Sequence, residues 1–193
     1  MKNEETVTNN YKGRLTPRAI LSLSIIGLFS ALICILTMII SIPIPATQGF
    51  INIGDAGVMI CGLLFGPIIG GFSGGIGSAL ADLFLGYTIY APGTLIIKGL
   101  EGFIVGIIAN PKKYYKKVNY RDFLAVLTGG LIMVYGYFLY EVFVFGLSAA
   151  FYELILNGLI QFGLGGLVAL IFISTARKPI IDNLPQVFDK IFI

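Results

Sequence analysis

The chain has 193 residues, of which 56% are hydrophobic and only 12% charged, and its mean hydropathy is +0.91. An ordinary soluble domain carries about 25% charged residues, so this composition is that of an integral membrane protein. At about 20 apolar residues per crossing, the length allows about six transmembrane helices and leaves no room for a separate soluble domain. Histidine is absent, which disfavours hydrolases with a histidine base and zinc sites with imidazole ligands.

Six apolar segments predict an all-α transmembrane bundle that forms one membrane domain over residues 1–193. They are residues 19–42, 56–71, 72–86, 94–109, 123–147 and 151–175. The first segment ends at an Ile-Pro-Ile-Pro sequence. Because proline disfavours helix in the residue before it, residues 41–54 are expected to form a loop. The tail after the sixth segment mixes polar and apolar residues, which indicates a short interfacial helix.

Lysines and arginines gather in three segments that share one side of a six-helix bundle. Four precede the first helix, five lie between the fourth and fifth helices, and three follow the sixth, which accounts for 12 of the 13. The positive-inside rule therefore predicts a multi-pass cell-membrane protein with both termini cytoplasmic. The polar N-terminal segment does not have the pattern of a cleaved signal peptide. The net charge of +3 is explained by topology and does not indicate nucleic-acid binding.

The remaining cation is Lys98, in the middle of the fourth predicted helix. A lysine at the centre of a transmembrane helix costs about 3 kcal/mol on insertion scales, and such residues usually face an interior cavity with a partner. Glu101 follows three residues later, on a neighbouring face of the helix. Two interpretations stay open: an ion pair that only fixes helix packing, or charged groups of a functional site.

Seven costly polar side chains occur at one level of the predicted bundle. At 1.5 Å per residue they lie about 3 to 15 Å below the outer ends of their helices, whereas the inner halves are almost purely apolar. This distribution predicts a hydrated pocket that is open to the outside and closed below, rather than a channel or a proton relay. The seven are Asp82, Lys98, Glu101, Glu141, Glu153, Asn157 and Gln161.

Tyrosines accompany these polar groups. Tyr137 and Tyr140 bracket Glu141, while Tyr87 and Tyr90 lie in the outer loop before the fourth helix. Their planar faces and hydroxyls suit a flat ligand ring. For the two loop tyrosines, membership of the aromatic belt at the membrane interface is the alternative.

Small residues indicate close helix packing or a docking surface. On the first predicted helix, Gly27 and Ala31 form a small-xxx-small ridge, which serves either packing within the bundle or docking of another membrane subunit. The glycine-rich segments elsewhere contain no G-x-x-x-x-G-K-[ST] sequence, so the chain is not expected to hydrolyse ATP by itself.

Five short motifs occur in an order that resembles the substrate-binding S components of energy-coupling factor (ECF) vitamin transporters. They are Phe50-Ile-Asn-Ile-Gly-Asp55, Leu64-Phe-Gly-Pro67, Gly77-Ser-Ala-Leu-Ala-Asp82, Tyr90-Ala-Pro92 and Ile97-Lys-Gly-Leu-Glu-Gly102. The resemblance spans most of the chain. It implies a six-helix bundle whose vitamin site lies near the outer face, covered by the loop after the first helix and lined by the last three helices.

The same resemblance implies partners. S components work with a membrane coupling subunit and two cytoplasmic ATPase subunits, so neither enzymatic activity nor a cofactor is expected in this chain. The ridge of the first helix docks onto the coupling subunit in the family, and Gly27 and Ala31 stand where two alanines are usual. The S component is thought to rotate within the membrane and so carry its site from outside to inside.

The predicted site is rich in acids, which constrains the vitamin. Five acids and one lysine suit a small heteroaromatic ring with hydroxyl donors or a protonatable nitrogen, and would repel a phosphate ester. Residues 51–56 resemble riboflavin-binding members, whereas the acid-rich pocket and the Tyr-Ala-Pro sequence resemble members assigned to pyridoxine or hydroxymethylpyrimidine. We therefore expect the pyridoxine or hydroxymethylpyrimidine type first and riboflavin next. The expected binding residues are Asp55, Asp82, Tyr90, Lys98, Glu101, Tyr137, Tyr140, Glu141, Glu153, Asn157 and Gln161.

Two other functions compete with this interpretation. A self-sufficient carrier would use the same pocket without ATPase partners. An intramembrane enzyme would hold Mg²⁺ between Glu101, Glu141 and Glu153. The sequence disfavours the enzyme because no close Glu-x-x-Glu or Asp-x-x-Asp pair occurs and Lys98 would compete with the ion, so no metal site is expected.

Overall fold

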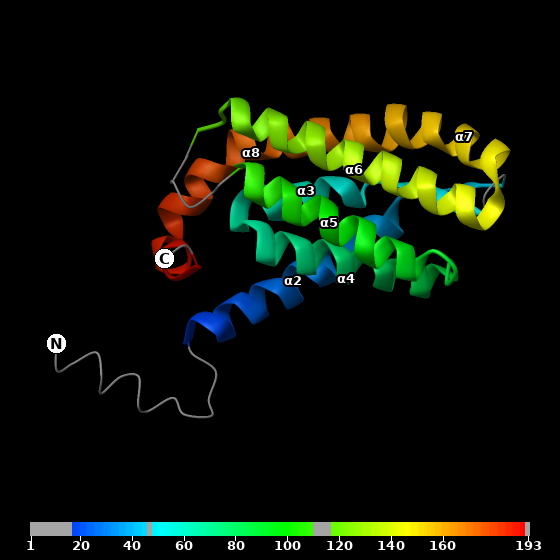
Figure 1. Ribbon diagram of the computed structural model, residues 1–193. Coiled ribbons are helices and arrows are strands. Elements are labelled where there is room, and N and C mark those ends of the chain that lie inside the picture. The colour runs from blue at the N-terminus through cyan, green and yellow to red at the C-terminus, as the bar shows by residue number, and fades with distance from the viewer. Residues whose placement is uncertain (1–16, 46–47, 110–116, 192–193) are drawn as a thin grey trace.

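The computed structural model describes residues 17–45, 48–109 and 117–191 (Figure 1). It is a bundle of helices with one short hairpin. In chain order the elements are α2 (Pro17–Ile39), β1 (Ser41–Ile44), β2 (Gly49–Asn52), α3 (Gly54–Phe65), α4 (Pro67–Leu85), α5 (Ala91–Ala109), α6 (Tyr120–Phe145), α7 (Leu147–Leu156), the π-helix η2 (Asn157–Phe162), α8 (Gly163–Asn183) and α9 (Pro185–Ile191).

Within the described residues, five helices are long and apolar enough to cross a membrane. The last of them runs without interruption through α7, η2 and α8. The second predicted segment corresponds to α3, which has only 12 residues. It is therefore about 18 Å long and shorter than the roughly 30 Å hydrocarbon core of a bilayer. All of its residues except Ile60 are buried by the surrounding helices. The protein is therefore an all-helical, multi-pass membrane protein with five to six apolar helices.

The helices divide the molecule into two ends. In Figure 1, α2 begins and α8 ends on the left, where α5 also ends and α6 begins. We call this the linker end, because the segment between α5 and α6 connects there. The β1–β2 hairpin lies at the opposite end, which we call the hairpin end, together with the α4–α5 and α6–α7 turns.

The predicted boundary between the second and third segments is wrong. The helix break lies at Gly66, between α3 and α4, and not after residue 71. Gly66 has a φ of 85°, which a residue with a side chain rarely adopts, and Pro67 supplies no backbone N–H. The glycines that suggested the other boundary lie inside α4. There they permit close packing, since a Cβ on Gly74 would lie 2.8 Å from the carbonyl oxygen of Lys98.

The expected loop over residues 41–54 is largely a β-hairpin. β1 and β2 pair antiparallel, with Ser41 opposite Asn52 and Ile44 opposite Gly49. The prolines of β1 favour extended backbone, as predicted, but the following segment supplies a second strand that satisfies backbone groups of the first. The other predicted helix ends shift by at most three residues, except that the last helix begins at Leu147 and continues to Asn183.

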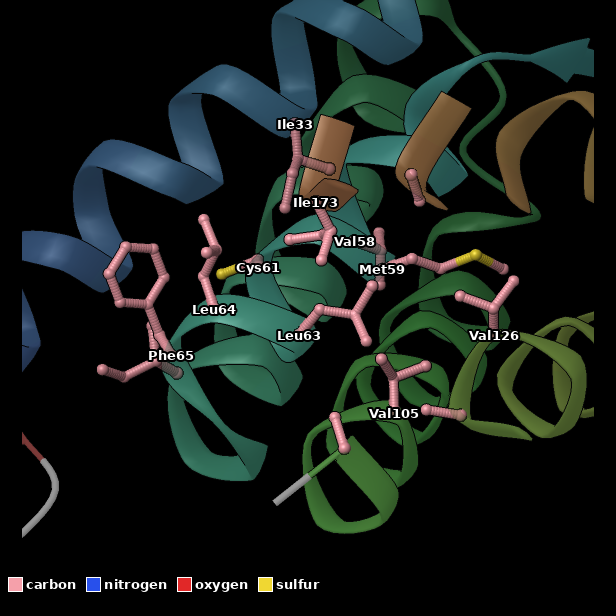
Figure 2. Close-up of a cluster of buried hydrophobic side chains, with 14 of the residues drawn as sticks. Ile33, Val58, Met59, Cys61, Leu63, Leu64, Phe65, Val105, Val126 and Ile173 are labelled. Atoms are coloured by element: carbon pink, nitrogen blue, oxygen red, sulfur yellow. The ribbon is translucent and has the colours of Figure 1, made fainter. Parts of the chain in front are cut away.

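The apolar core surrounds α3. Val58, Cys61 and Leu63 of α3 meet Val105 of α5 and Ile173 of α8, and all five side chains are at most 1% exposed (Figure 2). α3 is thus the centre of the bundle rather than a membrane-facing helix. This packing gives the hairpin end a closed apolar base.

A buried ion pair fastens the linker end. Arg177 of α8 donates to both carboxylate oxygens of Asp122, at 2.9 and 2.7 Å, and to the carbonyl oxygen of Leu63 at 3.3 Å. Asp122 also accepts the backbone N–H of Asn119 at 2.9 Å and so completes a capping box at the start of α6. The sequence reasoning counted Arg177 only as a topology charge, because nothing in the sequence indicated that it turns inward.

Candidate ligand site

The lysine in α5 is held by two carboxylates. Lys98 is 2% exposed and makes ion pairs with Asp55 of α3 and with Glu101, whose Oε2 lies 3.0 Å from the lysine Nζ. Both carboxylates have buried side chains. The predicted proximity of Lys98 and Glu101 is therefore present, and Asp55 joins them from another helix. The positive charge of Lys98 is committed to protein partners.

A small cavity lies next to this cluster at the hairpin end. Its volume is about 20 Å³, which is room for roughly one water molecule. The lining combines hairpin residues with side chains from α4 to α7 and η2. It consists of Gly49, Phe50, Asn52, Asp82, Tyr90, Thr94, Tyr137, Glu153 and Gln161.

A hydrogen-bonded chain forms one wall of the cavity. The Tyr137 hydroxyl donates to the Thr94 hydroxyl oxygen at 2.9 Å, and the Thr94 hydroxyl bonds to Asp82. The ring of Tyr137 also lies beneath Lys98, whose Nζ is 5.6 Å from the ring centroid, within range of a cation–π contact. The cavity wall and the Lys98 cluster are thus one connected unit.

The hairpin approaches the helices closely on the other side of the cavity. A Cβ added at Gly49 would lie 2.9 Å from the Glu153 carboxylate and 2.9 Å from the Tyr90 hydroxyl. The Tyr90 ring is 5.9 Å from that of Tyr140 and 5.7 Å from that of Phe145, centroid to centroid. Only glycine at position 49 lets the strand cover this aromatic wall without displacing it.

Gln161 fastens the hairpin to the helices. Its side-chain oxygen accepts the backbone N–H of Asn52 at 3.0 Å, and its side-chain nitrogen lies 3.8 Å from the sulfur of Met133. Gln161 belongs to the π-helix η2, and such turns shift the direction of the side chains that follow and often occur at functional sites. The glutamine predicted to bind ligand is therefore engaged mainly in holding the cover of the cavity.

Glu141 is buried beside the cavity. Its side chain is 0% exposed. The carboxyl group of Glu153 on α7 contacts that of Glu141, and Tyr137 lies one turn before it on α6. Two carboxyl groups buried against each other are costly and call for an explanation.

The predicted binding residues fall into three groups. Five of them line the cavity: Asp82, Tyr90, Tyr137, Glu153 and Gln161. Asp55, Lys98, Glu101 and Glu141 form the adjoining buried layer. Tyr140 lies further out, with its hydroxyl bonded to the carbonyl oxygen of Ile89 and its ring against Gly93. The side chain of Asn157 lies outside what the structure describes.

Sequence reasoning did not select four lining residues. Gly49, Phe50 and Asn52 belong to the segment expected to be a loop, and Thr94 lies at the start of the fourth predicted helix, where no polar residue was singled out. The motif that begins at Phe50 was the signal for the hairpin residues. For Thr94, its spacing of four residues from Lys98 on α5 was the available signal.

The ridge on α2 does not pack within the described part of the bundle. Gly27 and Ala31 are exposed, and a Cβ added at Gly27 would meet no atom within 4 Å. Leu28 and Leu32 on the same face are 65% and 44% exposed. This face is open to lipid or to another membrane protein.

Comparison with known proteins identifies the family. A family model described as "ECF-type riboflavin transporter, S component" matches residues 18–178. An uncharacterized protein in a gap 3' region of Pyrococcus woesei is 47% identical over 105 residues, which cover 54% of this chain and 68% of that protein. The thiamine precursor transporter HmpT of Lactococcus lactis is 30% identical over 115 residues, covering 59% of this chain and 66% of HmpT.

A UPF0397 protein of Streptococcus pneumoniae is 34% identical over 94 residues, covering 49% of each chain. The chain thus spans about two thirds of the length of the first two relatives and about half of the third. The family match, in contrast, runs from the start of α2 nearly to the end of α8. The chain belongs to the family of ECF-type transporter S components, which are membrane transport subunits and not enzymes.

Proposed function

We propose that this chain captures a small water-soluble vitamin in the hairpin-end cavity for ATP-driven uptake by partner subunits. The observation that carries the proposal is the convergence of polar side chains from six elements, most of them buried, on one cavity inside a membrane protein of this family. Burying such groups costs free energy, which a bound polar ligand offsets.

The vitamin is proposed to be of the pyridoxine or hydroxymethylpyrimidine type, with riboflavin next. Tyr90 and Tyr137 offer aromatic surfaces for a ring, and the relative HmpT is a thiamine precursor transporter, whereas the family model is that of riboflavin transporters. A cavity of about 20 Å³ is far smaller than the roughly 300 Å³ or more of typical ligand pockets. The hairpin must therefore move to admit a ring.

The hairpin end is proposed to face the outside of the cell, with both termini cytoplasmic. Apart from Lys98, the described cations gather at the linker end, and the segments 40–54, 86–91 and 146 contain no lysine or arginine. The positive-inside rule places such a linker end in the cytoplasm. The cations that support this orientation are Arg18, Lys117, Arg121, Arg177 and Lys178.

The proposed partners are a membrane coupling subunit and two cytoplasmic ATPase subunits. The exposed α2 face with Gly27 and Ala31 is the proposed docking surface for the coupling subunit, since small residues let a second helix approach closely. The lipid bilayer surrounds the remaining apolar faces.

Isothermal titration of the purified protein in detergent tests the capture function. Pyridoxine, hydroxymethylpyrimidine and riboflavin are titrated separately, and one of them is expected to bind with 1:1 stoichiometry. Glu153→Gln is expected to weaken that binding by about 1–3 kcal/mol. Ser148→Ala, an exposed change at the same end on α7, is the matched control and should leave affinity unchanged. If Glu153→Gln binds the vitamin as tightly as Ser148→Ala does, the placement of the site is refuted.

Transport assays separate this function from a self-sufficient carrier. Vesicles that contain the chain alone should not accumulate the vitamin, whereas vesicles that also contain the coupling and ATPase subunits should do so when ATP is supplied. Uptake by the chain alone would favour the carrier.

A further inference from the structure

The cavity region offers unsatisfied hydrogen-bond acceptors. Asp82 is 3% exposed and lines the cavity, and its Oδ2 has no hydrogen-bond partner in the described part of the chain. Glu141 is 0% exposed beside the cavity, and the side chain that contacts its carboxyl group is another buried acid, Glu153. A buried acceptor left unpaired costs about 1–3 kcal/mol, and more when it is charged. An unpaired oxygen on Asp82 and a pair of buried acids next to one cavity point to a ligand that donates hydrogen bonds.

The nearby donors, by contrast, already have acceptors. The Tyr137 hydroxyl donates to Thr94, and the Tyr140 hydroxyl donates to the carbonyl oxygen of Ile89. Lys98 donates to Asp55 and Glu101. The protein therefore has little to give to a ligand that carries only acceptors or a negative charge.

The charge balance of the chain also argues against a negatively charged ligand. Lys98 is the only lysine or arginine between Arg18 and Lys112, and none occurs between Arg121 and Arg177. These two stretches supply every residue that lines the cavity. Besides Asp122, which pairs with Arg177 at the linker end, they contain five buried carboxyl groups, of which two already share Lys98. The five are Asp55, Asp82, Glu101, Glu141 and Glu153.

A metal ion is a poor candidate for the missing positive charge. Within the described residues, no group of three or more Asp, Glu, Cys or His side chains is arranged to hold one. Asp82, Glu141 and Glu153 come from three different helices, and the Asp82 carboxylate is already bonded through Thr94 to Tyr137. A ligand that itself carries a positive charge and hydrogen-bond donors would balance these carboxyl groups.

We infer that the cavity selects a ring that carries a positive charge, as an ammonium substituent or a protonated ring nitrogen, and that Asp82 and Glu141 are the specificity-determining residues. This inference rests on the proposed function and names the substrate class of the same site. It reverses the expectation that Lys98 faces the ligand. An anionic vitamin would meet the carboxylates of the cavity without a free counter-charge, because the one lysine nearby is occupied.

The test compares ligands that differ only in charge. Pyridoxamine, pyridoxine and 4-pyridoxate carry an ammonium, an alcohol and a carboxylate on one ring, and the aminomethyl, hydroxymethyl and carboxyl forms of the methylpyrimidine provide a second series. Each is titrated into the full purified chain, with riboflavin in parallel. The ammonium form of the better-bound series is expected to bind at least about tenfold more tightly than the alcohol, and the carboxylate more weakly than both.

Isosteric neutral variants then assign the preference to residues. In Asp82→Asn and in Glu141→Gln, the ratio of ammonium to alcohol affinity is expected to fall at least about fivefold, while Ser148→Ala keeps it. Thermal unfolding shows whether each variant folds. If one variant does not fold, the affinity ratio measured for the other decides the test.

The outcomes separate this inference from the function on which it rests. Equal binding of the three charge forms, or an unchanged ratio in a folded Asp82→Asn or Glu141→Gln protein, overturns the charge inference but leaves vitamin capture in place. If riboflavin is the one vitamin that binds, the charge inference is likewise overturned and vitamin capture stands, because the riboflavin ring system is neutral. Failure of every vitamin to bind overturns the proposed function, and the charge inference with it.

Discussion

The two ends of the bundle each bury an ionic cluster, and the clusters differ in how completely they are satisfied. At the linker end, Arg177 forms a two-point contact with Asp122 and donates a further bond to Leu63. At the hairpin end, Lys98 pairs with two carboxylates, yet one oxygen of Asp55 and one of Glu101 lack hydrogen bonds among the described residues.

This difference separates a fully satisfied ion pair from an incompletely satisfied one. A buried ion pair is tolerated when hydrogen bonds satisfy its remaining atoms. The linker-end pair meets that condition and joins α3, α6 and α8. The hairpin-end cluster, with an unsatisfied oxygen also on Asp82, does not. Four experiments test this contrast and the roles of the residues around it.

Removing the linker-end cation should have the largest effect on stability. Arg177→Met leaves Asp122 buried without its partner, so the free energy of unfolding is expected to fall by about 3–5 kcal/mol. Thermal unfolding in detergent measures this loss. Lys178→Met, which changes an exposed neighbour, should unfold at the wild-type temperature. An unchanged Arg177→Met protein would mean that the pair is not structural.

Removing the hairpin-end cation should also destabilise the fold. Lys98→Met leaves Asp55 and Glu101 without their counter-charge, and a loss of about 3 kcal/mol is expected. Adding Asp55→Asn and Glu101→Gln to Lys98→Met should recover most of this loss, since no uncompensated charge then remains in the cluster. If Lys98→Met kept wild-type stability and lost only vitamin binding, Lys98 would contact the ligand after all.

Removing the hydrogen bond that holds the hairpin should have a smaller effect, seen in the rate at which the vitamin dissociates. Gln161→Leu removes the acceptor of the Asn52 backbone N–H, a bond worth about 0.5–1.5 kcal/mol. The dissociation rate of the bound vitamin is therefore expected to rise about two- to tenfold, measured by stopped-flow displacement. A slower or unchanged rate would show that the hydrogen bond does not hold the cover closed.

The α2 ridge should have the smallest effect on the isolated chain. Gly27→Leu places a side chain in open space, so stability is expected to change by less than about 0.5 kcal/mol. Co-purification with the coupling subunit should be lost, because a leucine prevents close helix approach. Gly163→Leu, at another glycine with open space around it on α8, is the control and should keep the complex. Retained assembly of the Gly27 variant would place docking elsewhere.

Most of the helices could be predicted from hydrophobicity and length, and the depth of the polar residues indicated one cavity region. The break at Gly66 was missed because several later glycines gave a similar local signal, and only the packing of α4 on α5 distinguishes them. Arg177 and Lys98 illustrate the harder problem. Each is a cation in or beside an apolar segment, and partners 55 and 43 residues away decide its role. No local pattern in the sequence encodes such distant pairings.

The central claim is that the hairpin-end cavity is the vitamin site. An experimental structure of the purified protein with its bound vitamin tests this most directly. The ring is expected between Asp82, Tyr137 and Glu153, beneath a hairpin displaced from its present position. Density for the vitamin in the apolar groove between α4 and α5, which is lined by residues such as Phe72 and Leu100, with the hairpin-end cavity still closed, would contradict the account.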